Sequence, residues 1–477
     1  MKKVLLSIIF LAAVFVSLGQ ARENVQIALL EPITAGDRIL IMAPHPDDEA
    51  IACAGVIQQA LKKRAAVKVL YLTNGDRNEF AFIVYEKRLV FRQGEFIHMG
   101  IKRMEESKKA MRLLGLSDKD LVFLGYPDGG TLNIFNRYWQ AKKPYCDILT
   151  HISKVPYKDN LSYGSVYTGE NILRDIEREI VNFKPSKIFV SHPADTNSDH
   201  RAFYLFLQVA LQDLKNLLDV TPQVHPYLVH SNQWPLPRRY HPKLNLDPPN
   251  NFLNSQIAWN KLTLESGEVD KKYQAVLCYK TQTLSAAFYL LSFVRGNELF
   301  GDYPELSLSR QHSVEKRALS FLGLSGMYPA SEADILDRSV DFGNDGAQAS
   351  FAVCDDVLLM RIEKEGAKER LALTFRIFGY RQDILFADMP KINIFTNKNN
   401  FRIYDKWKAL DSQGASLELS KGVLVMKVPL KLLGNPEFVL VSVKASGGLL
   451  PMEATSYRKI YIKEGVSDGA GIKIDQN

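Results

Sequence analysis

The chain has 477 residues, of which 46% are hydrophobic and 24% are charged. This length predicts two or three domains, and the apolar fraction excludes a chain that is disordered over long stretches. The formal net charge of +7 is small for this length and predicts neither a nucleic-acid partner nor adhesion to a membrane surface.

The first 21 residues have the pattern of a signal peptide. Lys2 and Lys3 form a basic start, residues 4–18 are apolar, and Gly19-Gln20-Ala21 offers small residues for cleavage. The apolar run is short for a membrane span, and no later stretch has about 18 uninterrupted apolar residues. We therefore expect an exported protein, periplasmic or extracellular, with no integral membrane span in the mature chain. The alternative is a segment that stays uncleaved as an anchor.

From residue 37 onwards, strand and helix patterns alternate. We expect strands at 37–42, 67–72, 121–124 and 187–190, and helices at 48–64, 101–114, 171–183 and 199–214. Alternation of this kind predicts parallel strands joined by right-handed crossovers, which gives a Rossmann-like, doubly wound, mostly parallel α/β sheet. The first strand is not followed by a Gly-x-Gly-x-x-Gly turn, so a dinucleotide site is not expected.

The first strand leads into the run Pro44-His45-Pro46-Asp47-Asp48-Glu49. Carboxylates this close together repel one another, and a divalent cation would relieve the repulsion. His45 and Asp48 can both reach one metal, which leaves Asp47 as a base. The alternative is an acidic helix start that the helix dipole favours, but that alternative does not require His45 or two prolines.

A second polar cluster, residues 191–200, follows the fourth expected strand and contributes His192, Asp195, Asp199 and His200. In open α/β sheets ligands bind at the carboxyl ends of the strands, so the two clusters are expected to meet there. A His-Asp-His zinc site with an open position for water is their natural assembly. The alternative for the second cluster is an ordinary helix N-cap, with His200 incidental.

These motifs resemble the PIG-L/LmbE-like zinc-dependent N-deacetylases over roughly residues 35–300. Other stretches agree with that family: Thr73-Asn74-Gly75-Asp76, Arg103 with Glu106 and Ala110, Tyr126-Pro127-Asp128-Gly129, and Lys272-Tyr273-Gln274-Ala275 with Tyr279 and Gln282. The chain departs from the family's shortest motif by an insertion between His192 and His200. Asn197 also stands where longer variants often carry another histidine.

The resemblance implies a hydrolase that removes N-acetyl groups from an N-acetylglucosamine-type sugar or glycoconjugate. The roles expected are Zn²⁺ (or Fe²⁺ or another divalent metal) bound by His45, Asp48 and His200, with Asp47 as general base, His192 as an imidazolium donor to the oxyanion, and Arg103, Asp128 and Asp199 binding substrate. Two alternatives stay open: an amidase for another N-acyl group, and a non-catalytic glycan-binding protein with this fold. A Gly-x-Ser-x-Gly elbow is absent, so a serine nucleophile is not expected.

Two long insertions, residues 77–100 and 131–169, interrupt the pattern. Aromatic residues in the second insertion could stack on sugar rings or could pin the loop to the body: Tyr138, Trp139, Tyr145, Tyr157, Tyr163 and Tyr167. His230 ends an apolar run and could reach the pocket, although a lone histidine there is more often structural. The four scattered cysteines predict no disulfide framework.

After about residue 330 the pattern changes to short strands separated by turn residues. They are expected at 357–363, 371–378, 391–395, 401–407, 423–429, 438–443 and 459–462. This predicts a β-sandwich at 335–465 after a deacetylase domain at 28–325, and we consider a carbohydrate-binding role for it by analogy of fold. Because every expected metal ligand lies upstream, we expect a chain ending near Leu324 to keep its activity on a small N-acetyl sugar.

Overall fold

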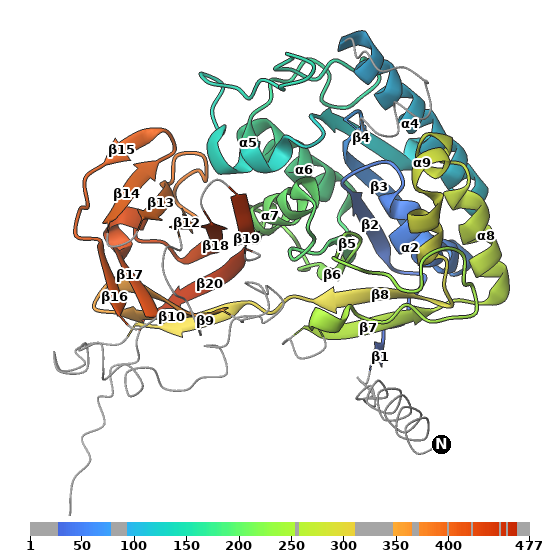
Figure 1. The fold of residues 1–477 in the computed structure, drawn as a ribbon. Coiled ribbons are helices and arrows are strands. Elements are labelled where there is room, and N and C mark those ends of the chain that lie inside the picture. Colours follow the sequence, from blue (N-terminus) through green and yellow to red (C-terminus); the bar gives the residue numbers. More distant parts are fainter. Residues whose placement is uncertain are drawn as a thin grey trace, which may run out of the picture.

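The computed structural model describes residues 27–77, 93–252, 257–310, 347–364, 372–397, 400–420, 423–447, 450–454 and 457–464. Figure 1 shows an α/β unit, with helices on both faces of a sheet, and an all-β unit beside it. The expected signal peptide lies outside the described residues, so export stays a prediction. Within the described ranges, no helix is both long enough and apolar enough to span a bilayer.

The α/β unit is built on an eight-stranded sheet with the order β1-β7-β8-β6-β5-β2-β3-β4. Strands β2 to β6 pair in parallel, whereas β8 runs antiparallel to both β6 and β7. The chain builds from β2 to β3 and β4 and then returns to the other side of β2 with β5 and β6, so the strand order reverses between β2 and β5. The mostly parallel, doubly wound sheet is thereby confirmed. The strands are β1 (Ala28–Leu29), β2 (Arg38–Ala43), β3 (Ala66–Thr73), β4 (Leu121–Tyr126), β5 (Lys187–Ser191), β6 (Gln223–Tyr227), β7 (Ala258–Thr263) and β8 (Asn297–Asp302).

The helices cover the two faces of this sheet, and alternate strand residues supply the two cores. Ile39 and Ile41 of β2 pack in the core with α2, α4, α8 and α9, whereas Leu40 and Met42 pack in the core with α5, α6 and α7. Burial on both faces explains why the central strands read as continuous apolar runs. The helices are α2 (Asp48–Lys62), α4 (Gln93–Leu114), α5 (Thr131–Arg137), α6 (Gly169–Phe183), α7 (Ser198–Asp213), α8 (Ser266–Val276) and α9 (Lys280–Leu290).

Both expected insertions contain structure that the sequence pattern did not predict. Helix α4 begins at Gln93, within the first insertion, and α5 lies within the second. Four aromatic side chains of the second insertion are buried, so they pin it to the body and do not form a sugar platform: Trp139, Tyr145, Tyr157 and Tyr167. No disulfide joins the four cysteines, all of which lie in the described ranges.

The all-β unit consists of two sheets around one core. One sheet has the order β10-β11-β17-β16, and the other has β15-β14-β13-β12-β18-β20-β9 with β19 beside β18. Side chains from both sheets share a single hydrophobic cluster, as a sandwich requires. Its strands are β9 (Leu306–Ser309), β10 (Ala347–Cys354), β11 (Val357–Lys364), β12 (Ala372–Tyr380), β13 (Lys391–Asn397), β14 (Asn400–Asp405), β15 (Lys408–Leu410), β16 (Ser416–Ser420), β17 (Val423–Pro429), β18 (Phe438–Gly447), β19 (Leu450–Ala454) and β20 (Arg458–Lys463).

The boundary between the units differs from the expected one. Strand β9 lies inside the range 28–325 that was expected for the deacetylase domain, yet it pairs in parallel with β20 of the sandwich. Parallel pairing joins segments that are remote in sequence, so the local pattern of four residues could not reveal it. The sandwich sheet therefore starts earlier in the chain than residue 335.

The two units share a hydrophobic core. The Phe135 ring of α5 lies 5.0 Å from Phe206 of α7 and 5.9 Å from both Phe378 and Phe386 of the sandwich, between ring centroids. All four side chains belong to the cluster that also covers one face of the central sheet. The sandwich is thus packed into the α/β unit, which corrects the expectation that it is an independent module.

A pair of acidic side chains at this junction predicts a pH effect on stability. Burial, and then Asp213, raises the pKa of Glu177 to about 8, and Asp213 also accepts a hydrogen bond from the Tyr380 hydroxyl at 2.6 Å. The folded protein therefore binds more protons than the unfolded chain between about pH 4.5 and pH 8. Stability should fall as pH rises through that window.

We expect Glu177→Gln to raise the melting temperature relative to the parent, and the gain should grow from pH 6 to pH 9. Glu105→Gln on the exposed side of α4 is the matched control and should show no such trend. Melting curves at four pH values measure both. A gain that is constant with pH would contradict the assignment of the proton to Glu177.

Candidate active site

The turn after β2 is fixed by its neighbours. Thr73, at the end of β3, donates from its backbone N–H and from its hydroxyl to the Pro44 carbonyl, each at 3.1 Å. Asp47 takes the N-cap position of α2 with a φ of 124°, a backbone angle that is strained for a residue with a side chain. Asp48 accepts a hydrogen bond from the His45 N–H at 2.9 Å. The turn thus brings His45 and Asp48 together.

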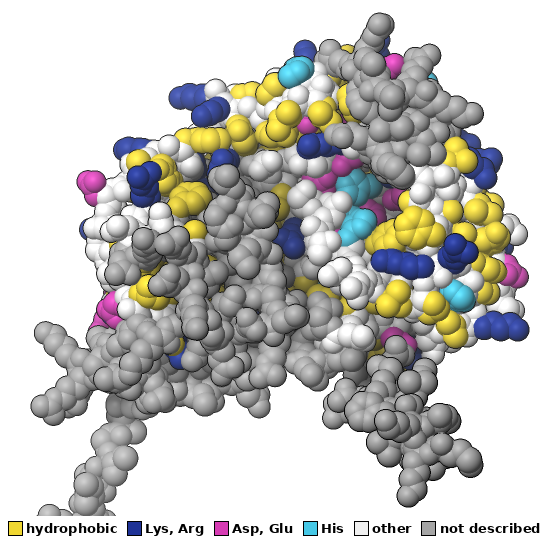
Figure 2. All heavy atoms as spheres, viewed as in Figure 1, with side chains coloured by type: hydrophobic (Ala, Val, Ile, Leu, Met, Phe, Trp, Pro, Cys, Tyr) yellow, Lys and Arg dark blue, Asp and Glu magenta, His cyan; other side chains and the backbone are white. Residues whose placement is uncertain are grey.

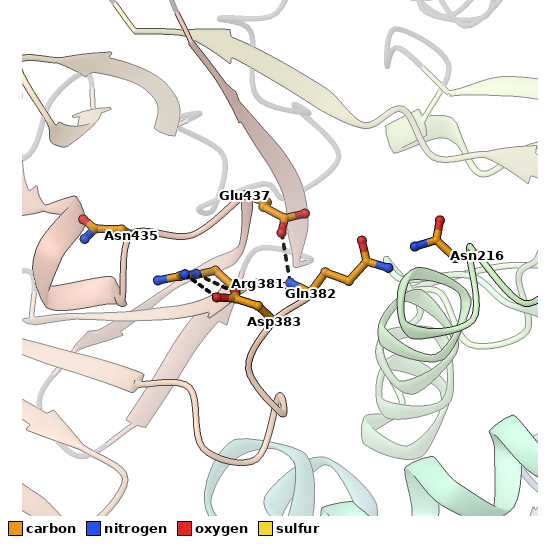
Figure 3. Close-up of a pocket in the computed structure, with 6 residues that line it drawn as sticks. All are labelled: Asn216, Arg381, Gln382, Asp383, Asn435 and Glu437. Carbon is orange, nitrogen blue, oxygen red and sulfur yellow. Dashed lines mark hydrogen bonds and ion pairs between the residues drawn. The ribbon is translucent and has the colours of Figure 1, made fainter.

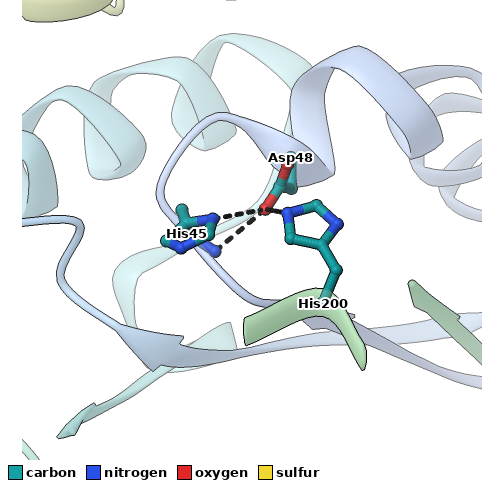
Figure 4. A group of neighbouring side chains, drawn as sticks. All are labelled: His45, Asp48 and His200. Atoms are coloured by element: carbon teal, nitrogen blue, oxygen red, sulfur yellow. Dashed lines mark hydrogen bonds and ion pairs between the residues drawn. The ribbon is translucent and has the colours of Figure 1, made fainter. Parts of the chain in front are cut away.

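His45, Asp48 and His200 form a candidate metal centre (Figure 4). Asp48 Oδ2 lies 3.3 Å from His45 Nδ1 and 3.2 Å from His200 Nε2. The three ligand atoms lie within 4.8 Å of one another, and all three residues are buried. His45 follows β2 and His200 lies in the first turn of α7, so both stand at the reversal of strand order. Figure 2 shows histidine and acidic side chains together in a hollow of the face in view.

Asp195 contacts the ring nitrogen of His200 that faces away from Asp48. Its Oδ2 lies 3.1 Å from His200 Nδ1 and accepts hydrogen bonds from the N–H groups of Val229 and His230. A carboxylate on one ring nitrogen fixes the tautomer and leaves the other nitrogen for a metal. The sequence pattern placed Asp195 in the second cluster but gave it no role. Its position beside the ring could not be read from spacing alone.

Asp128 and Asp199 hold His45 in the same way. Its Nε2 lies 3.3 Å from Asp128 Oδ1 and 3.2 Å from Asp199 Oδ2. Asp199 also accepts hydrogen bonds from the N–H groups of Gly129 at 2.6 Å and Thr131 at 3.1 Å. Asp128, by the family resemblance, and Asp199 were expected to bind substrate, and that role stays a prediction. In the structure both carboxylates lie beside His45 Nε2, where they can orient its ring.

The charge of this cluster fits a cation. Burial opposes the charged imidazole, yet Asp195 and Asp48 raise the pKa of His200 to about 9. The metal-facing Nε2 of His200 lies 3.2 Å from Asp48 Oδ2 but lacks hydrogen-bond geometry. Ligand atoms this close, with no well-placed donor between them, fit a divalent metal, which would neutralise the same carboxylates. Two His nitrogens and one carboxylate oxygen are also a usual ligand set for catalytic zinc.

Asp47 stays outside these ligands. Its Oδ2 lies 3.4 Å from Arg103 Nη2, and Arg103 donates to the carbonyls of Gly75 and Pro46, both at 2.7 Å. Burial raises the pKa of Asp47 to about 7, with Arg103 opposing the shift and Asp48 adding to it. A carboxyl group that titrates near neutrality suits a general base. Arg103 is buried and holds this turn, so its contacts do not support the substrate-binding role that the resemblance implied.

His192 is fully buried among aromatic side chains. Its ring stacks on Trp259 at 5.9 Å and meets Phe252 and Tyr303 edge-on, while its Nδ1 accepts a hydrogen bond from the Ala194 N–H. Burial lowers the pKa of His192 to about 3. A low pKa and an aromatic environment do not favour the charged imidazolium, and the expected role of His192 as a donor to the oxyanion stays a prediction.

His230 is the imidazole that approaches the centre instead. Its ring centroid lies 4.8 Å from that of His200, and its Nδ1 lies 3.4 Å from the Tyr289 hydroxyl. The pattern gave His230 as a residue that could reach the pocket, and the structure brings it there through the loop after β6. The signal was its position at a strand end.

Glu49, the last residue of the first motif, anchors α2. It is fully buried, accepts hydrogen bonds from the hydroxyls of Tyr71 and Tyr279, and accepts the Asp47 N–H at 3.0 Å. Burial raises its pKa to about 7. Tyr279, which the family resemblance singled out, therefore supports the turn that carries Asp47 and does not touch the candidate ligands directly.

A wide cleft of about 830 Å³ lies away from this centre, between the end of α7 and the sandwich (Figure 3). The charged side chains that line it already have partners. Arg381 forms an ion pair with Asp383, and Glu437 accepts a hydrogen bond from the Gln382 backbone N–H at 2.9 Å. None of the residues that line it is a histidine or a cysteine. They are Asn216, Arg381, Gln382, Asp383, Asn435 and Glu437.

The ligand assignment predicts two different losses of metal. His200→Ala should lose about one equivalent of divalent metal, because three protein ligands are the minimum for a catalytic site. Asp195→Asn should keep the ligands but bind metal roughly 10- to 100-fold more weakly. Elemental analysis and chelator competition measure these effects, with exposed His98→Ala on α4 as the control. Full occupancy in His200→Ala would contradict the ligand set.

Comparison with known proteins gives a family match over part of the α/β unit. Residues 40–211 match the family model PIG-L, described as GlcNAc-PI de-N-acetylase. No curated protein matches the chain. Among solved structures, a conserved protein from Thermus thermophilus is 20% identical, covering 52% of this chain and 82% of that chain, with a TM-score of 0.31.

Two deacetylases are also among the similar structures. The N,N′-diacetylchitobiose deacetylase from Pyrococcus horikoshii is 16% identical, covering 55% of this chain and 76% of its own, with a TM-score of 0.33. A deacetylase of teicoplanin biosynthesis is 14% identical, covering 55% of this chain and 97% of its own, with a TM-score of 0.36. At this level of similarity these structures say nothing on their own about the substrate of this chain. The family match covers residues 40–211, which include the motif residues of the site, so the α/β unit contains a PIG-L domain.

Proposed function

We propose that this protein is a metal-dependent hydrolase that removes the N-acetyl group from an N-acetylglucosamine-type sugar or glycoconjugate. The observation that carries the proposal is the cluster of His45, Asp48 and His200 at the strand ends of a PIG-L domain, with Asp47 next to the ligands but outside them. A degenerate, purely glycan-binding relative would have little reason to keep all four groups. The products would be acetate and a free amine.

The residues of the chain suit the steps of amide hydrolysis. A metal bound by His45, Asp48 and His200 would supply the Lewis acid for water and for the amide carbonyl. Asp47 would take the proton of the attacking water and pass it to the leaving amine, because its carboxylate lies beside the ligand set but outside it. Arg103 keeps Asp47 in place through its contact at 3.4 Å.

Zinc and export belong to the same proposal. Two imidazoles and one carboxylate are ligands that Zn²⁺ favours, and Fe²⁺ accepts the same set. The basic start at Lys2 and Lys3, followed by an apolar run and small residues up to Ala21, supports export. Metal analysis of the purified protein tests the first point. Cell fractionation with N-terminal sequencing of the mature chain tests the second.

A panel of N-acylated sugars tests the activity. Metal-loaded protein is incubated with N-acetylglucosamine, N,N′-diacetylchitobiose and N-hexanoylglucosamine, and free amine and carboxylate are quantified. Release of acetate that a chelator stops and added metal restores supports the proposal. Preference for the hexanoyl substrate would favour an amidase for another N-acyl group, and binding without release of either acid would favour a glycan-binding protein.

A further inference from the structure

A second pocket, distinct from the metal centre, lies where α5 meets the sandwich. It has a volume of about 400 Å³, which falls in the range of small-molecule sites. Helix α5 contributes Arg137, and strands β13 and β14 with the turn after them contribute the rest. Its lining residues are Arg137, Asn393, Phe395, Arg402, Tyr404, Lys406 and Trp407.

The strand register explains why these side chains share one face. Asn393 pairs with Tyr404 and Phe395 pairs with Arg402 across β13 and β14, so the four form a block on one side of the sheet. The alternate residues Ile392, Ile394 and Ile403 point to the other side and fill the sandwich core. The pocket wall is therefore the outer face of a well-anchored hairpin, not a mobile loop.

The pocket gathers positive charge around an exposed aromatic ring. Trp407 is 42% exposed, and the Arg137 guanidinium and the Lys143 ammonium lie 5.1 Å and 3.9 Å from its ring centroid. Within the described ranges, neither Arg137, Lys143 nor Arg402 has an ion-pair partner, and no acidic residue lines the pocket. Lys406 lines the wall but donates to the Ala387 carbonyl at 2.6 Å, so we count only the other three cations as available.

A buried acceptor faces the same pocket. Asn393 is 2% exposed, and its Nδ2 donates to the Lys391 carbonyl at 2.9 Å, while its Oδ1 has no hydrogen-bond partner. A buried amide oxygen without a partner costs free energy unless a ligand supplies a donor. A hydroxyl group is such a donor. The pocket thus offers an acceptor for a hydroxyl, aromatic faces for a ring with C–H groups, and cations for an acid.

We propose that this pocket binds an anionic sugar unit, a pyranose that carries a carboxylate, sulfate or phosphate group. Arg137 and Arg402 bind the anion, Trp407 and Tyr404 contact the ring, and Asn393 Oδ1 accepts a hydroxyl proton. The pocket adjoins the metal centre through α5, since Thr131 at its start donates to Asp199 and Arg137 at its end lines the pocket. Seven residues of helix span about 10 Å, a distance that one oligosaccharide can bridge.

Isothermal titration with two tetrasaccharides of equal length tests the proposal. Hyaluronan tetrasaccharide carries carboxylates, and chitotetraose is neutral. We expect the hyaluronan fragment to bind more tightly, and its affinity to fall roughly tenfold or more in Arg137→Gln/Arg402→Gln, with little change for chitotetraose. Lys119→Gln/Lys215→Gln removes two exposed charges elsewhere and should leave both affinities unchanged.

Tryptophan fluorescence gives a second readout. Trp407 is the exposed tryptophan, whereas Trp139, Trp234 and Trp259 are buried, so quenching by the hyaluronan fragment should vanish in Trp407→Phe. Equal affinity for the two tetrasaccharides, or unchanged affinity in the arginine double variant, would overturn the proposal. All titrations use the Asp47→Asn background, in which the ligand stays intact. Binding without acetate release in the parent would count against the deacetylase function and not against the pocket.

Discussion

Asp47→Asn should keep its metal and slow deacetylation by roughly 10²- to 10⁴-fold, the usual contribution of a general base. Asparagine keeps the size and the N-cap position of the side chain but cannot accept the proton of the attacking water. The contact at 3.4 Å from Arg103 Nη2 becomes a contact with a neutral amide, so the turn should persist. Steady-state rates and elemental analysis of the same preparation measure both parts of the result.

Glu105→Gln is the matched control, because it also neutralises a carboxylate but lies on the exposed side of α4. It should keep both the rate and the metal. A normal rate in Asp47→Asn would mean that Asp47 only caps α2 and that another group takes the proton. Loss of metal in Asp47→Asn would instead place its carboxylate among the ligands, against the geometry of the site.

The grouping of the three candidate ligands could be predicted because each follows a strand of the parallel sheet. His45 and Asp48 belong to the turn after β2, and His200 lies in the first turn of α7, the helix that follows β5. The partners of these residues could not be predicted, because they depend on which ring nitrogen faces which carboxylate. Asp195, Asp128 and Asp199 act through contacts between segments that are far apart in sequence.

The surroundings of His192 could not be predicted from the sequence either. A histidine at a strand end, in the same cluster as a candidate ligand, suggests a catalytic role, but the stacking of His192 on Trp259 depends on β7, which the sequence pattern did not reveal. For His230 the sequence could not separate a place in the pocket from a structural role. Only the return of the chain after β6 brings its ring within 4.8 Å of His200.

Some strands of the fold could be predicted from the sequence and others could not. Strands β2, β3, β4 and β5 lie close to their predicted bounds, since long buried apolar runs mark the centre of a parallel sheet. Strands β6 to β8 have fewer consecutive apolar residues and mix parallel with antiparallel pairing, so their pattern carried no clear period. The pairing of β9 with β20 is non-local and was missed entirely.

A chain that ends near Leu324 should fail to form a stable, soluble enzyme, although it contains every candidate ligand. Removal of the sandwich would expose the aromatic face of α5 and α7, where Phe135 packs against Phe206 on one side and against Phe378 and Phe386 of the sandwich on the other. It would also leave β9 without its partner β20. Exposed apolar surface and an unpaired strand edge both promote aggregation. Solubility, circular dichroism and metal content of the truncated chain measure the outcome.

A single substitution tests the same junction in the full chain. Phe135→Ala should cost about 3–5 kcal/mol of unfolding free energy, the usual loss for a buried phenylalanine, and the protein should still unfold in one transition. Phe351→Ala is the control, because Phe351 is also buried but lies in the sandwich core away from α5. If the two units are coupled, either change lowers the melting temperature of the whole protein and releases the metal at that temperature. If Phe351→Ala instead melts the sandwich while the metal stays bound, the units fold separately, and the activity of a truncated chain becomes the expected result.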